Sequence, residues 1–212
     1  ESDGIQIELQ SKVGKLFGDS ITELTKKVLE FFEIKNCKIH IEDMGALDYM
    51  LAARIEAVVK KCIDTDKEYL LPMLPQNNYQ TEKDTPRRSR LYLPGNTPKL
   101  ALNAGIHNPD GVILDLEDSV APSKKFEAAL LVRNALRSVD FYGAERMVRI
   151  NQIPLGLDDL KYVVPHNVNL LLVPKCESAE QILQINKKIE EISGKKIEET
   201  KIYLMPIIES AL

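Results

Sequence analysis

The order of hydrophobic and polar positions predicts a small folded unit over residues 1–63. Two short segments alternate apolar and polar residues, as half-buried strands do: Ile5–Leu9 and Lys38–Glu42. Two further segments carry apolar residues at helical spacing: Ile21–Phe32 and Leu47–Ile63. Ser20 and Glu23 form a candidate capping box for the first helix. These elements predict a small α+β domain.

The periodicity fades between residues 64 and 86. Pro72 and Pro75 interrupt this stretch, and polar residues fill 81–86. Prolines and clustered polar residues between periodic segments are typical of connections. We therefore expect a linker with few anchors, followed by a second domain over residues 87–212.

Short apolar runs alternate with helical stripes in this second region. The predicted strands are Arg90–Leu93, Val112–Leu116, Met147–Ile150, Leu170–Val173 and Ile202–Ile208. The predicted helices are Pro98–Ile106, Ser123–Val139, Leu157–Val164 and Ser178–Ile192. Such alternation is typical of βα units around a parallel sheet, so the fold class is α/β.

Composition then excludes several classes of protein. The 212 residues are 44% hydrophobic and 28% charged, which is typical of a globular protein. A net charge of -4 lacks the basic surplus that nucleic-acid binding favours. No apolar run reaches the roughly 18 residues of a membrane span, and no signal peptide opens the chain. We expect a cytoplasmic protein that binds neither nucleic acid nor membranes.

The cysteines and histidines do not predict a metal centre. Their spacing contains no CxxC motif and no zinc pair: Cys37, Cys62, Cys176, His40, His107 and His166. We expect the three cysteines to be buried thiols in a reducing compartment. We expect the histidines to be surface or structural residues.

Polar residues follow each predicted strand at its carboxyl end. They are Gly95 with Asn96, Asp115 with Glu117, Arg149 with Asn151, Lys175 with Glu177, and Glu209. In a (β/α)8 barrel these ends converge on one mouth, where the active site lies. We therefore expect the first five strands of a (β/α)8 TIM barrel, with a site at this edge, although five strands by themselves are too few to close the barrel.

The residue types leave several chemistries open. Asp115 and Glu117 lie on one strand face, where they could support a metal, transfer protons or pair with arginine. The planar fork of Arg149 suits a substrate carboxylate, a thioester enolate or an internal salt bridge. Lys175 could form a Schiff base, but the surrounding carboxylates favour a protonated, paired lysine. Glu209 offers an oxygen ligand to a hard cation.

The turn after the first predicted strand offers a possible anion site. Thr97 is a candidate cap for the next helix and Pro98 suits its first position. The free N–H groups of such a helix start attract anions, and Arg88 and Arg90 are close in sequence. The alternative is an ordinary βα turn.

Five motifs resemble, in order, those of the citrate lyase beta subunit and its HpcH-type aldolase relatives. They are the segments 88–95, 115–120, 148–151, 174–179 and 208–211, with the sequences RSRLYLPG, DLEDSV, VRIN, PKCESA and IESA. Separately, DMGALD at 43–48 and AAR at 52–54 resemble the citrate lyase acyl carrier protein, the gamma subunit.

The resemblance implies a Mg²⁺-dependent lyase that splits a 3-hydroxy-acyl thioester into a keto acid and an acetyl thioester. It implies Glu209 as a metal ligand, and Arg149, Asp115 and Glu117 as catalytic residues. The implied substrate contacts are Arg88, Arg149, Gly95, Asn96, Asp118 and Lys175. The thioester carrier is coenzyme A or a phosphoribosyl-dephospho-CoA prosthetic group. A citrate lyase alpha-type subunit and a homo-oligomer are the implied assemblies.

Three functional hypotheses follow from these observations. The first is a citryl-thioester lyase, and the second is a malyl-CoA or citramalyl-CoA lyase. The third is a non-catalytic carrier or scaffold subunit. The family's second metal carboxylate and its prosthetic-group serine have no counterpart in these residues, so we expect the 212 residues to be inactive by themselves.

Overall fold

The computed structural model describes residues 4–210 and divides the chain into two compact units. The first unit spans Glu1–Leu71 and the second spans Pro72–Leu212. The motif residue Ala211 and the first three residues lie outside the described part.

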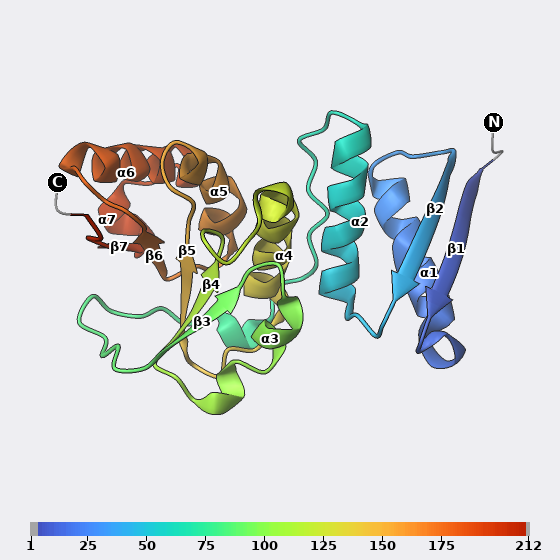
Figure 1. Ribbon diagram of the computed structural model, residues 1–212, viewed down its shortest axis with the longest axis horizontal. Coiled ribbons are helices and arrows are strands. Elements are labelled where there is room, and N and C mark those ends of the chain that lie inside the picture. Colours follow the sequence, from blue (N-terminus) through green and yellow to red (C-terminus); the bar gives the residue numbers. More distant parts are fainter. Residues whose placement is uncertain (1–3, 211–212) are drawn as a thin grey trace. The chain divides into compact units, whose positions relative to one another are not determined.

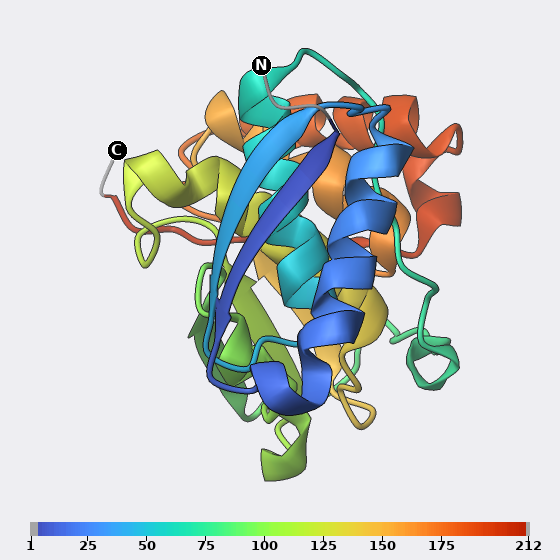
Figure 2. The ribbon, with the colours of Figure 1, turned by 90° about the vertical axis from the view of Figure 1, so that its right-hand side faces the viewer.

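The first unit is a two-stranded parallel sheet with two helices, so it is a parallel α/β unit and not the α+β domain that the sequence predicted. In chain order its elements are β1 (Ile5–Ser11), α1 (Gly14–Phe31), β2 (Cys37–Asp43) and α2 (Asp48–Cys62). Figure 2 shows the strands side by side with the helices behind them. The alternating apolar residues of both strands pack on a core from the helices that includes Val28, Phe32, Ile55 and Val59. Alternation therefore predicted the buried face of each strand.

The predicted capping box at Ser20 is wrong. Helix α1 begins at Gly14, so Ser20 lies inside it, and its hydroxyl donates to the Phe17 carbonyl at 2.9 Å. Such back-bonding is what a serine within a helix commonly does. A capping box does occur at α6, where Ser178 and Gln181 satisfy each other's backbone N–H groups.

The second unit contains a five-stranded parallel sheet in the order β3-β4-β5-β6-β7. The strands are β3 (Arg90–Pro94), β4 (Gly111–Asp115), β5 (Glu145–Arg149), β6 (Leu170–Val173) and β7 (Tyr203–Pro206). The helices are α3 (Pro98–Leu102), α4 (Lys125–Ser138), α5 (Leu155–Val163), α6 (Ala179–Ser193) and α7 (Ile197–Thr200). Helices α4, α5 and α6 lie along one side of the sheet (Figure 1). The α/β prediction is confirmed.

Two predicted elements are shorter than expected. The helix predicted over 98–106 is a five-residue α3 followed by the 3-10 turn η2 (Gly105–His107). The strand predicted over 202–208 pairs only over Tyr203–Pro206. Further 3-10 turns are η1 (Pro75–Asn77), η3 (Pro122–Lys124) and η4 (Val164–His166).

The face of the sheet away from the large helices is apolar at its centre and curved. Ile113, Met147, Leu170 and Leu172 are buried there, with Tyr203 and Met205 packed against them. Arg90 of β3 reaches β7, where its Nη1 lies 3.3 Å from Met205 Sδ. In a flat sheet four strand spacings would separate β3 from β7 by about 19 Å, more than these side chains span. The sheet therefore curves so that its two ends approach each other.

The predicted linker is attached to the second unit along its later half. Leu74 N–H donates to the Arg137 carbonyl at 2.7 Å, and Asn77 Nδ2 donates to the Val139 carbonyl at 2.5 Å. Tyr79 donates to the Ala144 carbonyl at 2.6 Å. The expectation of few anchors was wrong for residues 74–81, because their polar groups pair with distant backbone that local periodicity does not reveal. The exact domain boundaries stay a prediction.

The cysteines and histidines are partly as expected. Cys176 is buried, but Cys37 is half-buried and Cys62 is exposed. His40 and His107 are exposed, whereas His166 is buried and its Nδ1 lies 3.1 Å from Arg137 Nη1.

Candidate functional site

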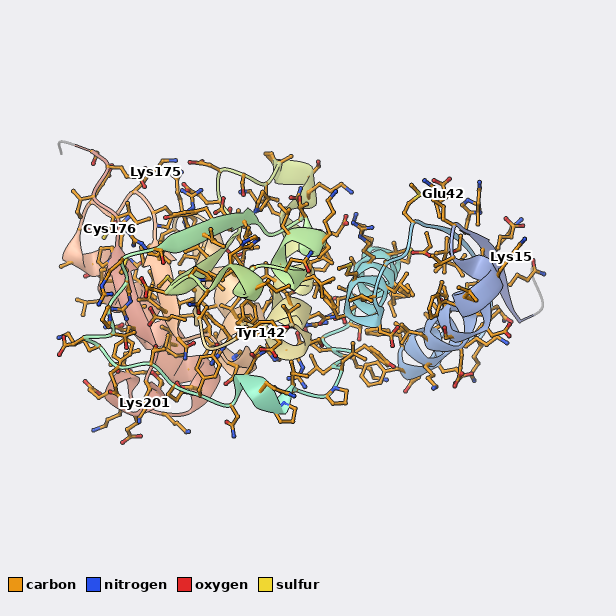
Figure 3. All side chains as sticks on the ribbon, turned by 90° about the horizontal axis from the view of Figure 1, so that it is seen from below. Lys15, Glu42, Tyr142, Lys175, Cys176 and Lys201 are labelled. Carbon is orange, nitrogen blue, oxygen red and sulfur yellow. The ribbon has the colours of Figure 1, made fainter. Side chains whose placement is uncertain are left out.

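The carboxyl ends of the five strands lie along one edge of the sheet, because all pairs are parallel. Figure 3 shows Lys175, which follows β6, at one edge of the second unit. Lys201, which precedes β7, lies at the opposite edge. The sequence-predicted polar residues after β4, β5 and β6 therefore share the carboxyl edge, as expected.

Asp115 and Arg149 form a two-point ion pair at this edge. Arg149 Nε lies 2.7 Å from Asp115 Oδ1, and Nη2 lies 2.8 Å from Oδ2. The pair forms because Asp115 and Arg149 are partners in the β4–β5 register. Burial opposes ionisation of Asp115, but the hydrogen bonds from Arg149 and Ser119 outweigh it and lower the pKa of this carboxyl. The hydrogen bond to Asp115 likewise raises the pKa of Arg149.

Glu117 lies beside the same guanidinium. Its Oε2 is 3.0 Å from Arg149 Nη1, yet this contact is not aligned as a hydrogen bond, so Oε2 is a buried acceptor without one. Its Oε1 accepts from Gln152 Nε2 at 3.1 Å and from Lys175 Nζ at 3.0 Å. Two carboxylates and two cations thus meet at one point, and Oε2 is the acceptor left for another donor.

Lys175 is the more accessible cation of this cluster. Its side chain is 38% exposed, against 16% for Arg149, and its Nζ also lies 3.5 Å from Asp118 Oδ1. The hydrogen bond to Glu117 raises the pKa of Lys175. A protonated ammonium cannot attack a carbonyl, so the geometry favours the paired lysine over the Schiff-base alternative.

Gly95 lets the turn after β3 approach β4 closely. Its N–H donates to the Asp115 carbonyl at 2.8 Å, and a Cβ at this position would lie 2.7 Å from the same oxygen. Any side chain here would push the turn away from Asp115. Asn96, next in the chain, is half-buried and accepts from the Thr97 hydroxyl at 3.3 Å. Thr97 therefore does not cap α3 with its side chain.

Arg88 does not reach the cluster. It is exposed and precedes β3, close to Asp110, which precedes β4. Both lie at the amino edge of the sheet, whereas the cluster lies at the carboxyl edge. A substrate contact of Arg88 at this cluster was expected, and its position corrects that expectation. Arg88 is close in sequence to the Gly95 turn, but the two ends of an extended strand lie apart. The structure also does not support the anion site predicted at the start of α3, because a helix of five residues has no developed dipole.

Three residues that the sequence did not single out support the cluster. Gln152 contacts Glu117, as described above. Lys125, at the start of α4, donates through Nζ to the Leu116 carbonyl at 2.7 Å and to the Glu117 carbonyl. Asp159, in α5, accepts from the backbone and the side chain of Asn151 at 2.7 and 2.9 Å. The sequence signal was their position after the site strands, Gln152 in the turn before α5 and Lys125 and Asp159 in helices α4 and α5.

Glu209 lies three residues beyond β7 and is exposed. The loop after β6 runs beside this segment, because Cys176 N–H donates to the Ile207 carbonyl at 3.0 Å. The apolar run before Glu209 is not deeply buried, because β7 is an edge strand and its residues are only half-buried or exposed. Glu209 therefore avoids the desolvation cost of a buried carboxylate.

The described residues offer few ligands for the metal that the resemblance implies. Within residues 4–210, no three His, Cys, Asp or Glu side chains are grouped so as to hold a metal ion. Asp115 and Glu117 face Arg149 and Lys175, so neither is a ready metal ligand. An exposed carboxylate such as Glu209 fits Mg²⁺, which keeps several waters and uses one or two protein carboxylates. The described residues therefore fit Mg²⁺ through one carboxylate ligand, Glu209.

Comparison with known proteins identifies the family. The model for HpcH/HpaI aldolase/citrate lyase matches residues 88–212. The chain belongs to this family. A second model, described as malonate decarboxylase delta subunit (MdcD), of the acyl carrier protein type, matches residues 1–62. Both predicted resemblances are confirmed.

Curated relatives cover the same region. Citrate lyase subunit beta of Leuconostoc mesenteroides subsp. cremoris is 35% identical over 59% of this chain and 43% of its own length. The Haemophilus influenzae subunit is 38% identical over 59% and 44%. Human mitochondrial citramalyl-CoA lyase is 35% identical over 67% and 43%. The chain thus spans less than half the length of these relatives.

A solved structure shows a weaker likeness to this HpcH/HpaI family member. It is protein CitE of Mycobacterium tuberculosis in complex with magnesium and acetoacetate. The identity is 26%, the TM-score is 0.43, and the match covers 59% of this chain and 46% of that one.

Among residues 4–210, no helix combines the length and the apolar character needed to cross a bilayer.

Proposed function

We propose that this chain is part of a carbon–carbon lyase that cleaves citryl thioester to oxaloacetate and an acetyl thioester. The observation that carries the proposal is the cluster of Asp115, Glu117, Arg149 and Lys175 at the carboxyl edge of the sheet. Membership of the citrate lyase family supplies the reaction class. The curvature of the sheet supports a (β/α)8 barrel, whose active site would occupy this edge.

The reaction needs one proton moved and one negative charge stabilised. A base removes the proton of the substrate hydroxyl, the adjacent carbon–carbon bond breaks, and its electrons form the enolate of the acetyl thioester. The enolate then takes up a proton. In our proposal Glu117 is the carboxylate nearest to this proton transfer, because Oε2 is its acceptor without a hydrogen bond.

Arg149 is the proposed partner of the enolate oxygen. Asp115 holds Nε and Nη2, which fixes the plane of the guanidinium. A guanidinium has five N–H donors, so donors on Nη1 and Nη2 remain for an oxyanion. Lys175, with Asp118 beside it, is the proposed contact for a substrate carboxylate, since its ammonium is the exposed cation of the cluster.

Glu209 is the proposed Mg²⁺ ligand of this chain. When bound, the ion holds and polarises the oxygens of the substrate. Gly95 and Asn96 line the proposed pocket through the turn after β3 and contact substrate there. The thioester is carried on coenzyme A or on a phosphoribosyl-dephospho-CoA prosthetic group, and the first unit resembles an acyl carrier protein.

A second candidate is cleavage of citramalyl-CoA, favoured by the likeness to the human citramalyl-CoA lyase. A malyl-CoA substrate would use the same chemistry. The first unit would then serve assembly rather than acyl transfer. A homo-oligomer, a citrate lyase alpha-type partner and a cytoplasmic location belong to the citryl proposal.

The deciding experiment supplies the intact protein with Mg²⁺ and, in separate reactions, citryl-CoA, citramalyl-CoA and malyl-CoA. Oxaloacetate, pyruvate or glyoxylate, each with acetyl-CoA, identifies the substrate. A phosphoribosyl-dephospho-CoA adduct found by mass spectrometry of the intact protein would favour the citryl reaction. Release of no keto acid from any substrate by folded protein would favour the scaffold hypothesis instead.

A further inference from the structure

We infer that Asp159 is a positioning residue, which fixes the turn between β5 and α5 so that Gln152 meets Glu117. The effect of Asp159 on turnover rests on the proposed function. The contacts themselves connect a helix residue behind the sheet to the carboxylate at the candidate site.

The first contact fixes Asn151 at two points. Asp159 is buried, with 5% of its surface exposed, and its Oδ2 accepts both Asn151 N–H and Asn151 Nδ2. The distances are 2.7 and 2.9 Å. Because both donors belong to one residue, the carboxylate sets the backbone and the side chain of Asn151 together. Hydrogen bonds to an ionised acceptor are roughly twice as strong as neutral ones.

The turn is also held against the start of α5. A Cβ on Gly156 would lie 2.1 Å from the Asn151 carbonyl oxygen, so the helix and the turn are in direct backbone contact. Gly156 N–H donates to the Gln152 carbonyl at 2.9 Å. The backbone of Asn151 and Gln152 is therefore held in place while Asp159 keeps its contacts.

Gln152 carries this constraint to the site. Its Nε2 donates to Glu117 Oε1 at 3.1 Å, the same oxygen that Lys175 contacts at 3.0 Å. The path from Asp159 to Glu117 thus consists of hydrogen bonds and a single peptide link. The neighbouring turn is held in a similar way, because Lys125 donates to the Leu116 and Glu117 carbonyls and its charge also acts on Asp159. Asp159 and Lys125 together fix the two turns that carry Glu117 and Gln152.

The test measures kcat and KM of the intact protein with Asp159→Asn, Gln152→Ala and both changes. The neighbouring Asp158→Asn is the matched control, since Asp158 is exposed on the same helix. A displaced catalytic group costs up to roughly a hundredfold. We expect each single variant to lower kcat about tenfold with KM within about twofold, and the double variant to be no worse, because both act through one path. The control should keep wild-type values.

Hydrogen exchange of the backbone at residues 116–118 and 151–153 gives a readout that does not need turnover. Faster exchange in both segments of Asp159→Asn, but not of Asp158→Asn, supports the inference even if no thioester is cleaved. Unchanged exchange at 116–118 overturns it. Multiplied kcat losses in the double variant, or equal losses in the Asp158 control, also overturn it.

Discussion

Arg149 holds Asp115 through two nearly equal contacts, 2.7 Å from Nε to Oδ1 and 2.8 Å from Nη2 to Oδ2. The two residues are 34 positions apart in sequence and face each other because β4 pairs with β5. This pairing fixes the guanidinium plane next to Glu117.

The first prediction concerns Arg149→Lys. Lysine keeps the charge but cannot bridge both oxygens of Asp115, so we expect stability to fall by about 1–3 kcal/mol. The loss of turnover should be far larger than this loss of stability would explain, because the remaining guanidinium N–H donors and their fixed direction are lost. Urea unfolding and thioester cleavage measure the two effects. The control is Arg88→Lys at the opposite edge, and near-normal activity of Arg149→Lys would remove Arg149 from the site.

The second prediction concerns the metal. Loss of groups that merely support a metal ligand commonly costs tenfold or more. Glu209→Gln should therefore raise the Mg²⁺ concentration needed for half-maximal activity at least about tenfold. Glu177→Gln, a change of an exposed carboxylate on the preceding loop, should leave it unchanged. The same Mg²⁺ dependence in Glu209→Gln and wild type would mean that Glu209 binds no metal.

The third prediction separates this site from a Schiff-base aldolase. The hydrogen bond from Lys175 to Glu117 keeps the ammonium protonated and raises its pKa. Borohydride added during turnover with pyruvate or oxaloacetate should therefore leave Lys175 unmodified. Peptide mass spectrometry measures this, with an authentic Schiff-base aldolase as the positive control. A reduced keto-acid adduct on Lys175 would contradict the paired-lysine assignment.

The fourth prediction concerns acid sensitivity through His166. Burial, with Arg137 and Arg133 nearby, lowers the pKa of His166 to about 3. Below the ordinary histidine pKa near 6.5, His166 binds a proton in the unfolded chain but stays neutral in the folded chain. The free energy of unfolding therefore falls as the pH drops from about 6.5 toward 3. At pH 5 the loss should be about 2 kcal/mol. His166→Gln should flatten the pH dependence of the unfolding free energy between pH 7 and 5.

The control for this measurement is His107→Gln, which removes an exposed histidine and should keep the wild-type slope. An unchanged slope in His166→Gln would show that His166 does not contribute to acid sensitivity.

The fifth prediction concerns the connection between the two units. Tyr69 N–H donates to Glu56 at 3.2 Å in the first unit, and Leu74 is tied to Arg137 in the second. Thermolysin should therefore cut first between Tyr69 and Leu74, and later, if at all, within 74–87. Mass spectrometry of the fragments locates the cut. First cleavage within 74–87 would restore the longer linker that the sequence predicted.

The sequence by itself determined the elements and the edge that carries the site. Strand and helix patterns depend on neighbours within one window, so Leu170–Val173 was predicted with its observed bounds and α2 within one residue. Parallel strands bring their carboxyl ends together, so Asp115, Arg149 and Lys175 could be assigned to one edge before any contact was known.

Only the tertiary structure decided which of these residues touch. The contact between Lys175 and Glu117 spans 58 residues, and no local pattern encodes it. No local pattern predicts the contact of Asp159 with Asn151 either, because the position of Asp159 depends on how α5 packs. Arg88 lies close in sequence to the Gly95 turn but at the other end of β3 in space, because a strand is extended and separates its own ends.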